Sequence, residues 1–163
     1  MLDAARRTCV FLRKAWRAGL IPVGLGTVPI AEIRFSTPNA WLASWMAGTT
    51  CTVYATPHYA LLVGSERLVP QETAYWAWQR SLRGTDHPRP DEWIEAMLVR
   101  LLTLFASIRR NGYRHRCIAD RLAVLEDLTL WDGGHRLACL GALGWTQVPV
   151  VRLRRRGRWL SGI

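Results

Sequence analysis

The sequence predicts a compact α+β domain, and three observations point to this class. The chain has 163 residues, which is enough for one domain with a buried core. Apolar residues recur at helical spacing between residues 91 and 110, and a glycine turn with a helix-like segment separates two strand-like runs between residues 122 and 153. Half of the residues are hydrophobic and 9 are tryptophan, so a disordered chain is not expected.

The charge of the chain favours anionic partners. Its 22 basic residues outnumber its 12 acidic residues, the formal net charge is +10, and Lys14 is the only lysine. Arginine binds phosphate through a planar, bidentate fork. A nucleotide, a nucleic acid or an acidic lipid surface is therefore the expected kind of partner.

The cysteines and the apolar runs argue against two other classes of protein. Cys9, Cys51, Cys117 and Cys139 are far apart and form no C-x-x-C pair. A structural zinc site is therefore not expected. The protein is expected in a reducing compartment, the cytoplasm. Charged residues interrupt every apolar run before it reaches the roughly 18 to 20 residues that span a bilayer, so no transmembrane helix is expected.

The first element is predicted to be an amphipathic helix that ends at Gly19. Five basic residues fall on one arc of its helical wheel: Arg6, Arg7, Arg13, Lys14 and Arg17. Six residues take the other arc: Cys9, Phe11, Leu12, Ala15, Trp16 and Ala18. This helix either packs on the domain core or rests on anionic lipid through residues 3–19, at the inner face of a membrane.

The segments that follow carry weaker signals. A short strand is expected around Val28 to Ile33, and a helix is expected from Pro70. The stretch "TPHYALLVG" predicts a turn followed by a short apolar element. Its His58 is either a hydrogen-bonded structural histidine or a catalytic one.

The segment from Asp91 to Arg110 predicts the clearest helix of the chain. Arg109 and Arg110 occupy the last turn, and Gly112 follows as a C-terminal cap. Leu101, Leu102 and Phe105 are expected to face the core. The apolar residues at helical spacing are Ile94, Met97, Leu98, Leu101, Leu102, Phe105 and Ile108.

The glycine turn is the strongest candidate site. A strand is expected from Leu122 to Trp131, a turn from Asp132 to Arg136, a helix from Leu137 to Leu143, and a strand from Val148 to Leu153. Glycine lets backbone N–H groups approach a ligand, and the first N–H groups of a helix lack partners within it. With the charge of Arg136, the turn suits a phosphate. Alternatively, Asp132 is an ordinary helix N-cap and no ligand binds.

Three stretches resemble ParB-like domains of the ParB/sulfiredoxin superfamily. "DGGHRLACLGALGWTQVPVV" is similar to the family pattern D-G-x-H-R-x-x-A…L-G…[IV]-P-V, although Ala138 comes one residue early. "SIRRNG" is similar to a helix end with S-I-x-x-x-G, and "VPIAEI" resembles an opening strand. The matching residues are Ser107, Ile108, Gly112, Asp132, Gly133, His135, Arg136, Leu143, Gly144, Pro149 and Val150.

The resemblance implies a compact, single-domain ParB/sulfiredoxin-like α+β fold with an added N-terminal helix and a helical insertion. Residues 1–27 would be the helix and a linker, 28–153 the domain with an insertion at about 40–90, and 154–163 a basic tail. Gly134 stands where sulfiredoxins carry their reactive cysteine, so that activity is disfavoured. The chain ends ten residues past Leu153, which leaves no space for the helix-turn-helix domain of partition proteins.

Three functions follow as alternatives. The first is a nucleotide-dependent kinase or NTPase that binds ATP, ADP or CTP with Mg²⁺. Its phosphates would lie on Gly133, Gly134, His135 and Arg136, and its catalytic residues would be Asp132, which positions the metal, His135, and Glu32 as a base.

The other two alternatives are not enzymes. One is a nucleic-acid-binding protein that uses Arg154, Arg155, Arg156 and Trp159, because a basic run beside an aromatic ring can hold phosphates and stack on a base. The other is an accessory protein that docks on a membrane or on an enzyme partner through its N-terminal helix.

Overall fold

The computed structural model describes residues 2–36, 50–64, 69–81 and 89–156, and all structural statements below concern these residues. The chain has an α+β fold, as the sequence predicts. The predicted insertion at about 40–90 falls only partly within the described ranges.

The centre of the fold is a four-stranded sheet with the order β1-β6-β4-β5. β1 (Leu20–Pro29) pairs antiparallel with β6 (Gln147–Arg155). β6 pairs parallel with β4 (Leu122–Leu125), and β4 pairs antiparallel with β5 (Leu130–Asp132). Residues 148–151 of β6 are all buried, so the middle of the sheet is covered on both faces.

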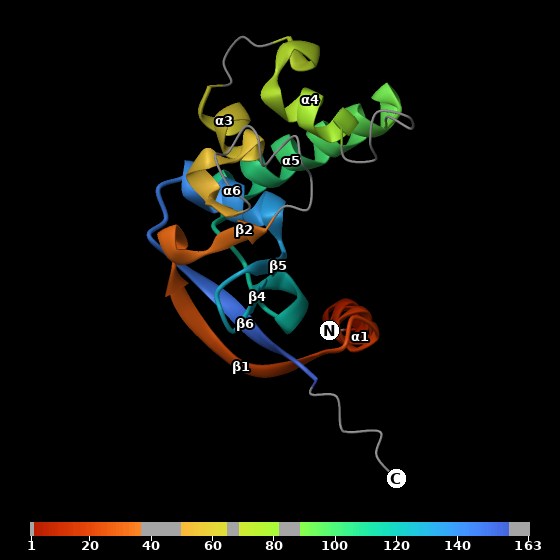
Figure 1. Cartoon of the computed structure of the whole chain (residues 1–163), viewed down its shortest axis with the longest axis vertical. Coiled ribbons are helices and arrows are strands. Elements are labelled where there is room, and N and C mark those ends of the chain that lie inside the picture. The colour runs from red at the N-terminus through yellow and green to blue at the C-terminus, as the bar shows by residue number, and fades with distance from the viewer. Residues whose placement is uncertain (1, 37–49, 65–68, 82–88, 157–163) are drawn as a thin grey trace.

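Helices lie on both sides of this sheet (Figure 1). α3 (Pro57–Val63), α4 (Ala74–Ser81), α5 (Asp91–Asn111) and α6 (Gly134–Ala142) form one layer, in the upper part of the figure. α1 (Leu2–Arg17) lies apart from them, beside β4.

Neighbouring residues of β4 and β6 belong to two separate hydrophobic clusters. Val124 and Val150 pack with residues of α3, α4, α5 and α6. Ala123 and Val151 pack with Phe11 of α1. Because successive side chains of a strand point to opposite faces, α1 covers the face opposite α6.

A small second sheet lies beside the first. β2 (Arg34–Ser36) pairs antiparallel with β3 (Thr50–Thr52), and Phe35 stands opposite Cys51. The N–H of Arg34 donates to the carbonyl of Leu128 over 3.1 Å, which ties β2 to the loop before β5.

The apolar periodicity correctly predicts where α5 lies in the sequence, but it overestimates how wide the buried face of the helix is. Leu101 is fully buried and Phe105 is half-buried against the core, as expected. Leu102 is 41% exposed, so the prediction that it faces the core is wrong. It lies about 100° around the helix from Leu101, outside the stripe that α6 covers. Gly112 has φ +70° and donates its N–H to Ile108, which confirms the cap.

The N-terminal helix is present and ends before Gly19, whose φ is +70°. Of the predicted apolar arc, only Phe11 and Ala15 are buried, whereas Leu12 and Trp16 are exposed. The sheet buries only these two residues, which lie one helical turn apart, and the rest of the arc is exposed to solvent. No described helix is long and apolar enough to cross a membrane.

Several element boundaries differ from the sequence predictions. Residues 20–27, expected to be a linker, belong to β1, and the strand expected near Ile33 is instead the 3₁₀ helix η1 (Ile30–Glu32). The strand expected from Leu122 to Trp131 is a hairpin, because the chain turns at Leu128, which has φ +62°. β6 continues to Arg155, so the tail begins later than residue 154.

Boundaries also differ at two helices. The helix expected from Pro70 begins with the 3₁₀ turn η3 (Pro70–Glu72), and α4 follows it. α6 begins at Gly134 rather than at Leu137. Gly134, His135 and Arg136 are therefore helical residues, and their backbone N–H groups form the start of a helix.

Candidate functional site

The glycine turn joins the end of β5 to the start of α6, and Gly133 is its pivot. Gly133 is the N-cap of α6 and has φ +103°, a left-handed conformation that favours glycine. A Cβ at this position would lie 2.8 Å from Cδ2 of Leu122. Backbone conformation and close packing therefore both require glycine here, before any ligand is considered.

Asp132 links the turn to Lys14 of α1 and to Arg136 of α6. Its Oδ1 accepts the N–H of Gly133 over 3.0 Å, and its Oδ2 lies 3.5 Å from Nζ of Lys14 and 4.0 Å from Nη2 of Arg136. The alternative in which Asp132 caps the helix is wrong, because Gly133 is the N-cap and no side chain caps α6.

A metal site at Asp132 finds little support in its surroundings. Within the described ranges, no three His, Cys, Asp or Glu residues are grouped so that they could hold a metal ion. Asp132 is already engaged with an N–H group and a lysine. This donor set does not fit a divalent metal held by the protein, so we derive no metal-dependent step.

The start of α6 presents backbone donors. Its first intrahelical hydrogen bond runs from the N–H of Leu137 to the carbonyl of Gly133, over 2.9 Å. The N–H groups of Gly134, His135 and Arg136 precede this bond and have no partner inside the helix. They carry the positive end of the helix dipole, which favours an anion.

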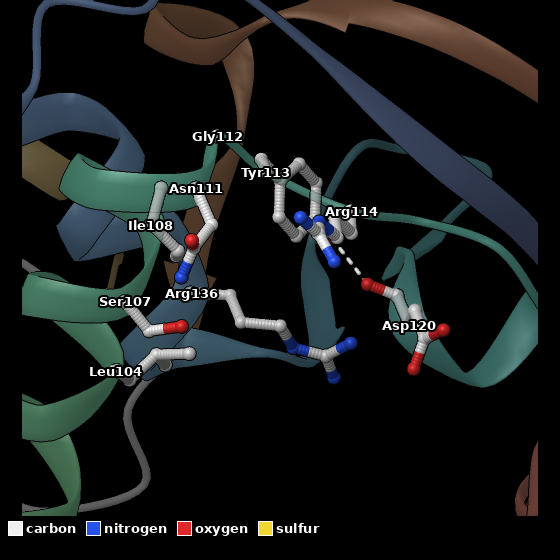
Figure 2. Close-up of a pocket in the computed structure, with 9 residues that line it drawn as sticks. All are labelled: Leu104, Ser107, Ile108, Asn111, Gly112, Tyr113, Arg114, Asp120 and Arg136. Atoms are coloured by element: carbon white, nitrogen blue, oxygen red, sulfur yellow. Dashed lines mark hydrogen bonds between the residues drawn. The ribbon is translucent and has the colours of Figure 1, made fainter.

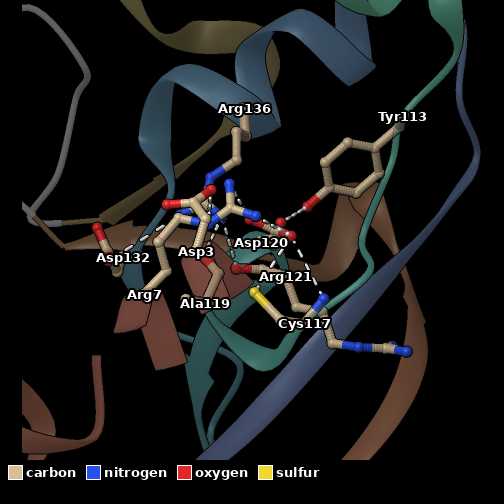
Figure 3. Close-up of polar contacts among 9 residues, drawn as sticks. All are labelled: Asp3, Arg7, Tyr113, Cys117, Ala119, Asp120, Arg121, Asp132 and Arg136. Atoms are coloured by element: carbon tan, nitrogen blue, oxygen red, sulfur yellow. Dashed lines mark hydrogen bonds and ion pairs between the residues drawn. The ribbon is translucent and has the colours of Figure 1, made fainter. Parts of the chain in front are cut away.

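The guanidinium of Arg136 is engaged with backbone carbonyls, which the sequence did not suggest. Its Nη1 donates to the carbonyls of Ala119 and Arg121, over 2.8 and 2.9 Å. These carbonyls belong to or follow the 3₁₀ helix η4 (Ile118–Asp120). The guanidinium, expected to complete a phosphate site, therefore holds α6 to η4 (Figure 3).

A polar network continues around η4. Asp120 accepts from the N–H and the Sγ of Cys117, and its Oδ1 lies 3.2 Å from Nη1 of Arg7 in α1. The hydroxyl of Tyr113 donates to the carbonyl of Asp120. Burial raises the pKa of Tyr113, and the positive charge of Arg136 opposes this shift. These contacts fix η4 between α1 and α6.

A cavity of about 230 Å³ lies between this network and the end of α5. Figure 2 shows Arg136 extending from α6, with Ser107 and Leu104 of α5 near its stem and Asp120 beyond its guanidinium. Its remaining lining residues are Ile108, Asn111, Gly112, Tyr113 and Arg114. We call it the Arg136 cavity.

A second and larger cavity, of about 590 Å³, includes the start of α6 itself. Elements far apart in the sequence supply its walls. Phe35 comes from β2, His58 from α3, Trp78 from α4 and Leu104 from α5, and the turn contributes residues 132–136. We call it the α6 cavity.

The two histidines of the α6 cavity carry no charge at neutral pH. Burial, and then the neighbouring His135, lowers the pKa of His58 to about 3. Burial, and then Arg100, lowers the pKa of His135. The ring centroids of His58 and His135 lie 5.0 Å apart, and those of His58 and Trp78 lie 4.5 Å apart. One wall is thus a neutral aromatic cluster.

The other predicted site residues lie elsewhere. Glu32 is exposed in η1 and lines neither cavity at the start of α6. Arg154 and Arg155 are exposed at the end of β6, and the guanidinium of Arg156 lies 3.7 Å from the ring centroid of Trp16. Trp159 lies outside the described residues. The structure therefore brings the predicted turn residues together at the α6 cavity but does not bring Glu32 to them; these residues are Asp132, Gly133, Gly134, His135 and Arg136.

The sequence did not identify the aromatic wall. His58 stood out as a histidine of uncertain role, but Phe35 and Trp78 gave no separate signal. Trp78 belongs to the stretch "AYWAWQ", and only the packing of α4 selects which of its rings reaches the cavity. Its density of aromatic residues was the one available hint.

Comparisons with known proteins give one structural similarity. No protein-family model and no curated protein match the chain. A solved Pnob8-like ParB-N domain is similar to it at 12% sequence identity and a TM-score of 0.39, over 83% of this chain. The match spans 31% of the length of that chain. The α+β class is confirmed by the structure itself, and membership of the ParB/sulfiredoxin superfamily stays a prediction.

Proposed function

We propose that this protein binds a phosphate-bearing small molecule, most simply a nucleotide, in the α6 cavity. The phosphates would accept hydrogen bonds from the N–H groups of Gly134, His135 and Arg136. One observation carries the proposal: the N–H groups at the start of α6, which have no partner within the helix, belong to residues that line a cavity of about 590 Å³. A cavity of this size matches the usual volume of small-molecule sites, roughly 300 to 1,000 Å³.

The charges around the turn support an anion. Asp132 alone would repel a phosphate, but Lys14 lies 3.5 Å from its carboxylate and Arg136 lies 4.0 Å from it. These two cations offset its charge, and the helix dipole adds a further positive potential. Arg136 thus helps to bind a phosphate through its charge and through the position it gives to α6.

The proposal is limited to binding. Kinase or NTPase activity would need a base near the phosphates, and Glu32 lines neither cavity at the turn. His135 is neutral and lines the α6 cavity, so its imidazole is the best-placed proton acceptor. Phosphoryl transfer with ATP, ADP or CTP and Mg²⁺ stays a prediction from the resemblance.

A thermal-shift panel tests the proposal. ATP, ADP, CTP and GTP would each be added with and without Mg²⁺, together with inorganic tripolyphosphate. A ligand at 100 times its Kd stabilises the folded state by about 2.7 kcal/mol, which raises the Tm of a domain of this size by roughly 5 to 10 °C. If neither tripolyphosphate nor any nucleotide raises the Tm, the proposal is wrong.

Two variants locate the ligand. We expect His135→Ala to weaken nucleotide binding, measured by calorimetry, because it removes a wall of the cavity. Arg155→Ala removes a charge at the far end of β6 and is expected to have little effect. Equal weakening by both variants would indicate general electrostatics. Weakening by Arg155→Ala alone would place the ligand on the basic end of β6, as the nucleic-acid alternative requires.

A further inference from the structure

Two polar atoms in the wall of the α6 cavity lack partners. Nδ1 of His58 and Nε1 of Trp78 are buried, and neither has a hydrogen-bond partner in the described part of the chain. His58 as a whole is only 5% exposed. Folded proteins leave few buried polar groups unpaired, because each one loses its hydrogen bonds to water. Both residues line the α6 cavity, and a ligand bound there can supply the partner once a small rotation of the two rings turns these buried atoms towards it.

Side-chain hydrogen bonds fix the starts of the two helices that carry these rings. Thr56 caps α3: its hydroxyl accepts the N–H of Tyr59 and donates to the carbonyl of Val53. Thr73 accepts the N–H of Trp76 at the start of α4 in the same way. The caps therefore fix the backbone from which His58 and Trp78 extend into the wall of the cavity.

The arrangement of the rings joins this wall to the start of α6. His58 packs edge-to-face on Trp78, and it also contacts His135, which is itself part of the turn. On the other side of the turn, Cε1 of Phe35 lies 3.4 Å from the position that a Cβ of Gly134 would take. The cavity therefore has aromatic surfaces beside its backbone donors.

The chemistry of the unpaired atoms restricts what can meet them. The indole Nε1–H of Trp78 can only donate, whereas Nδ1 of a neutral histidine donates or accepts, depending on the tautomer. The wall carries no charge at neutral pH, because burial keeps His58 in its neutral form. A matching group is uncharged, is planar enough to lie among aromatic rings, and carries at least one hydrogen-bond acceptor.

We infer that His58 and Trp78 form a subsite for the base of the nucleotide, and that they bind ring nitrogen or carbonyl oxygen atoms at its edge. The phosphates would lie at the start of α6, on the other side of His135. This inference rests on the proposed function, because it assigns the part of the same ligand that carries no phosphate.

Calorimetry with two kinds of probe tests the subsite. Inorganic tripolyphosphate reports on the start of α6 alone, whereas ATP, CTP, GTP and UTP also carry a base. At least one nucleotide is expected to bind the wild-type chain at least tenfold more tightly than tripolyphosphate does. Trp78→Phe keeps an aromatic ring but removes the donor, and we expect it to weaken that nucleotide roughly 3- to 10-fold, which is typical of one lost hydrogen bond. Tripolyphosphate affinity should stay unchanged.

Trp145→Phe is the matched control. It makes the same chemical change on a ring that packs against Tyr113 and lines neither cavity at the start of α6. Nucleotide affinity should stay within twofold of the wild type. His58→Asn is a second test at the wall, because it exchanges the imidazole for a smaller polar group.

One measurement needs no variant. The indole ¹H–¹⁵N resonance of Trp78 should shift when the nucleotide is added and stay in place when tripolyphosphate is added. This result would support the subsite even if a substituted chain folds poorly.

The outcomes separate the two proposals. If tripolyphosphate and every nucleotide bind equally well, or if the indole resonance of Trp78 does not shift when the nucleotide is added, the proposal of a base subsite is wrong. The proposal of a phosphate site is then unaffected. If neither tripolyphosphate nor a nucleotide binds the wild-type chain, the phosphate site and the subsite that rests on it are both wrong.

Discussion

His135 and Arg136 are adjacent in the sequence and both line the α6 cavity, but they make different contacts at the start of α6. His135 lines the α6 cavity beside an aromatic wall and is neutral at pH 7. Arg136 donates to two carbonyls around η4 and is an anchor for the helix. The arginine of this turn therefore supports the architecture, and in the proposed site the backbone N–H groups are the donors that contact the anion.

The two glycines of the turn show the same division. Gly133 is required by its φ of +103° and by the proximity of Leu122. Gly134 has ordinary helical space, with the ring of Phe35 as its nearest neighbour. The first glycine is required by the fold, whereas the second lacks these constraints and lines the α6 cavity.

The largest expected effect concerns the helix that supports both sides of α6. Leu101 is fully buried against α6, and Leu102 beside it is 41% exposed. Leu101→Ala should lower the free energy of unfolding by about 2 to 5 kcal/mol, and Leu102→Ala by less than about 1 kcal/mol. Denaturant unfolding of both variants checks this. Equal losses would mean that the buried face of α5 is misplaced.

The glycine pair sharpens the comparison within the turn. Gly133→Ala adds left-handed strain and a contact of 2.8 Å, so it should cost about 2 to 4 kcal/mol of stability. Gly134→Ala meets Phe35 at 3.4 Å and should change stability by no more than about 1 kcal/mol. Thermal unfolding measures both. A Gly133→Ala protein as stable as the wild type would show that this turn is not constrained.

Arg136→Ala tests the role of Arg136 as an anchor. Its loss leaves the carbonyls of Ala119 and Arg121 without their charged donor, so stability should fall by about 1.5 to 3 kcal/mol. Arg136→Lys should restore only part, because one ammonium group cannot reproduce the planar fork. Arg155→Ala removes the same charge from an exposed position and should change stability by less than about 0.5 kcal/mol. An Arg136→Ala protein as stable as the wild type would show that Arg136 is not an anchor for α6.

The two histidines of the α6 cavity predict that the free energy of unfolding depends on pH. The pKa of His58 is about 3 when folded and about 6.5 when unfolded, so the unfolded chain binds more protons between these values. This contribution is therefore complete above pH 6.5 and is lost as the pH falls towards 3. Between pH 6.5 and 5 the loss should be about 2 kcal/mol, and the lowered pKa of His135 acts in the same direction.

Unfolding of His58→Phe over the same pH range is the control. The variant should show a shallower loss of stability than the wild type. Parallel curves would mean that His58 is not buried in its neutral form.

Local patterns predicted much of the fold and part of the site. The spacing of Leu98 and Leu101 predicted α5, and the glycine turn predicted the order of β5, α6 and β6, because these signals depend on neighbours in the sequence. The direction of Arg136 could not be predicted, since its carbonyl partners lie 15 and 17 residues earlier in a segment without periodicity.

The aromatic wall could not be predicted for a similar reason. Phe35, His58 and Trp78 come from three elements and meet only through tertiary packing. In α1, the wheel predicted the amphipathic helix but not which stripe the sheet would bury. The exposed Leu12 and Trp16 leave the proposal of a peripheral lipid contact open to a flotation assay.

The central claim is that the N–H groups at the start of α6 bind the phosphate of a ligand. ¹H–¹⁵N NMR during titration with tripolyphosphate tests this claim most directly, because it observes those groups. We predict that the amide resonances of Gly134, His135 and Arg136 shift most, and that those of Arg154 and Arg155 at the end of β6 shift little. Large shifts at Arg154 and Arg155, with the α6 amides unmoved, would contradict the account.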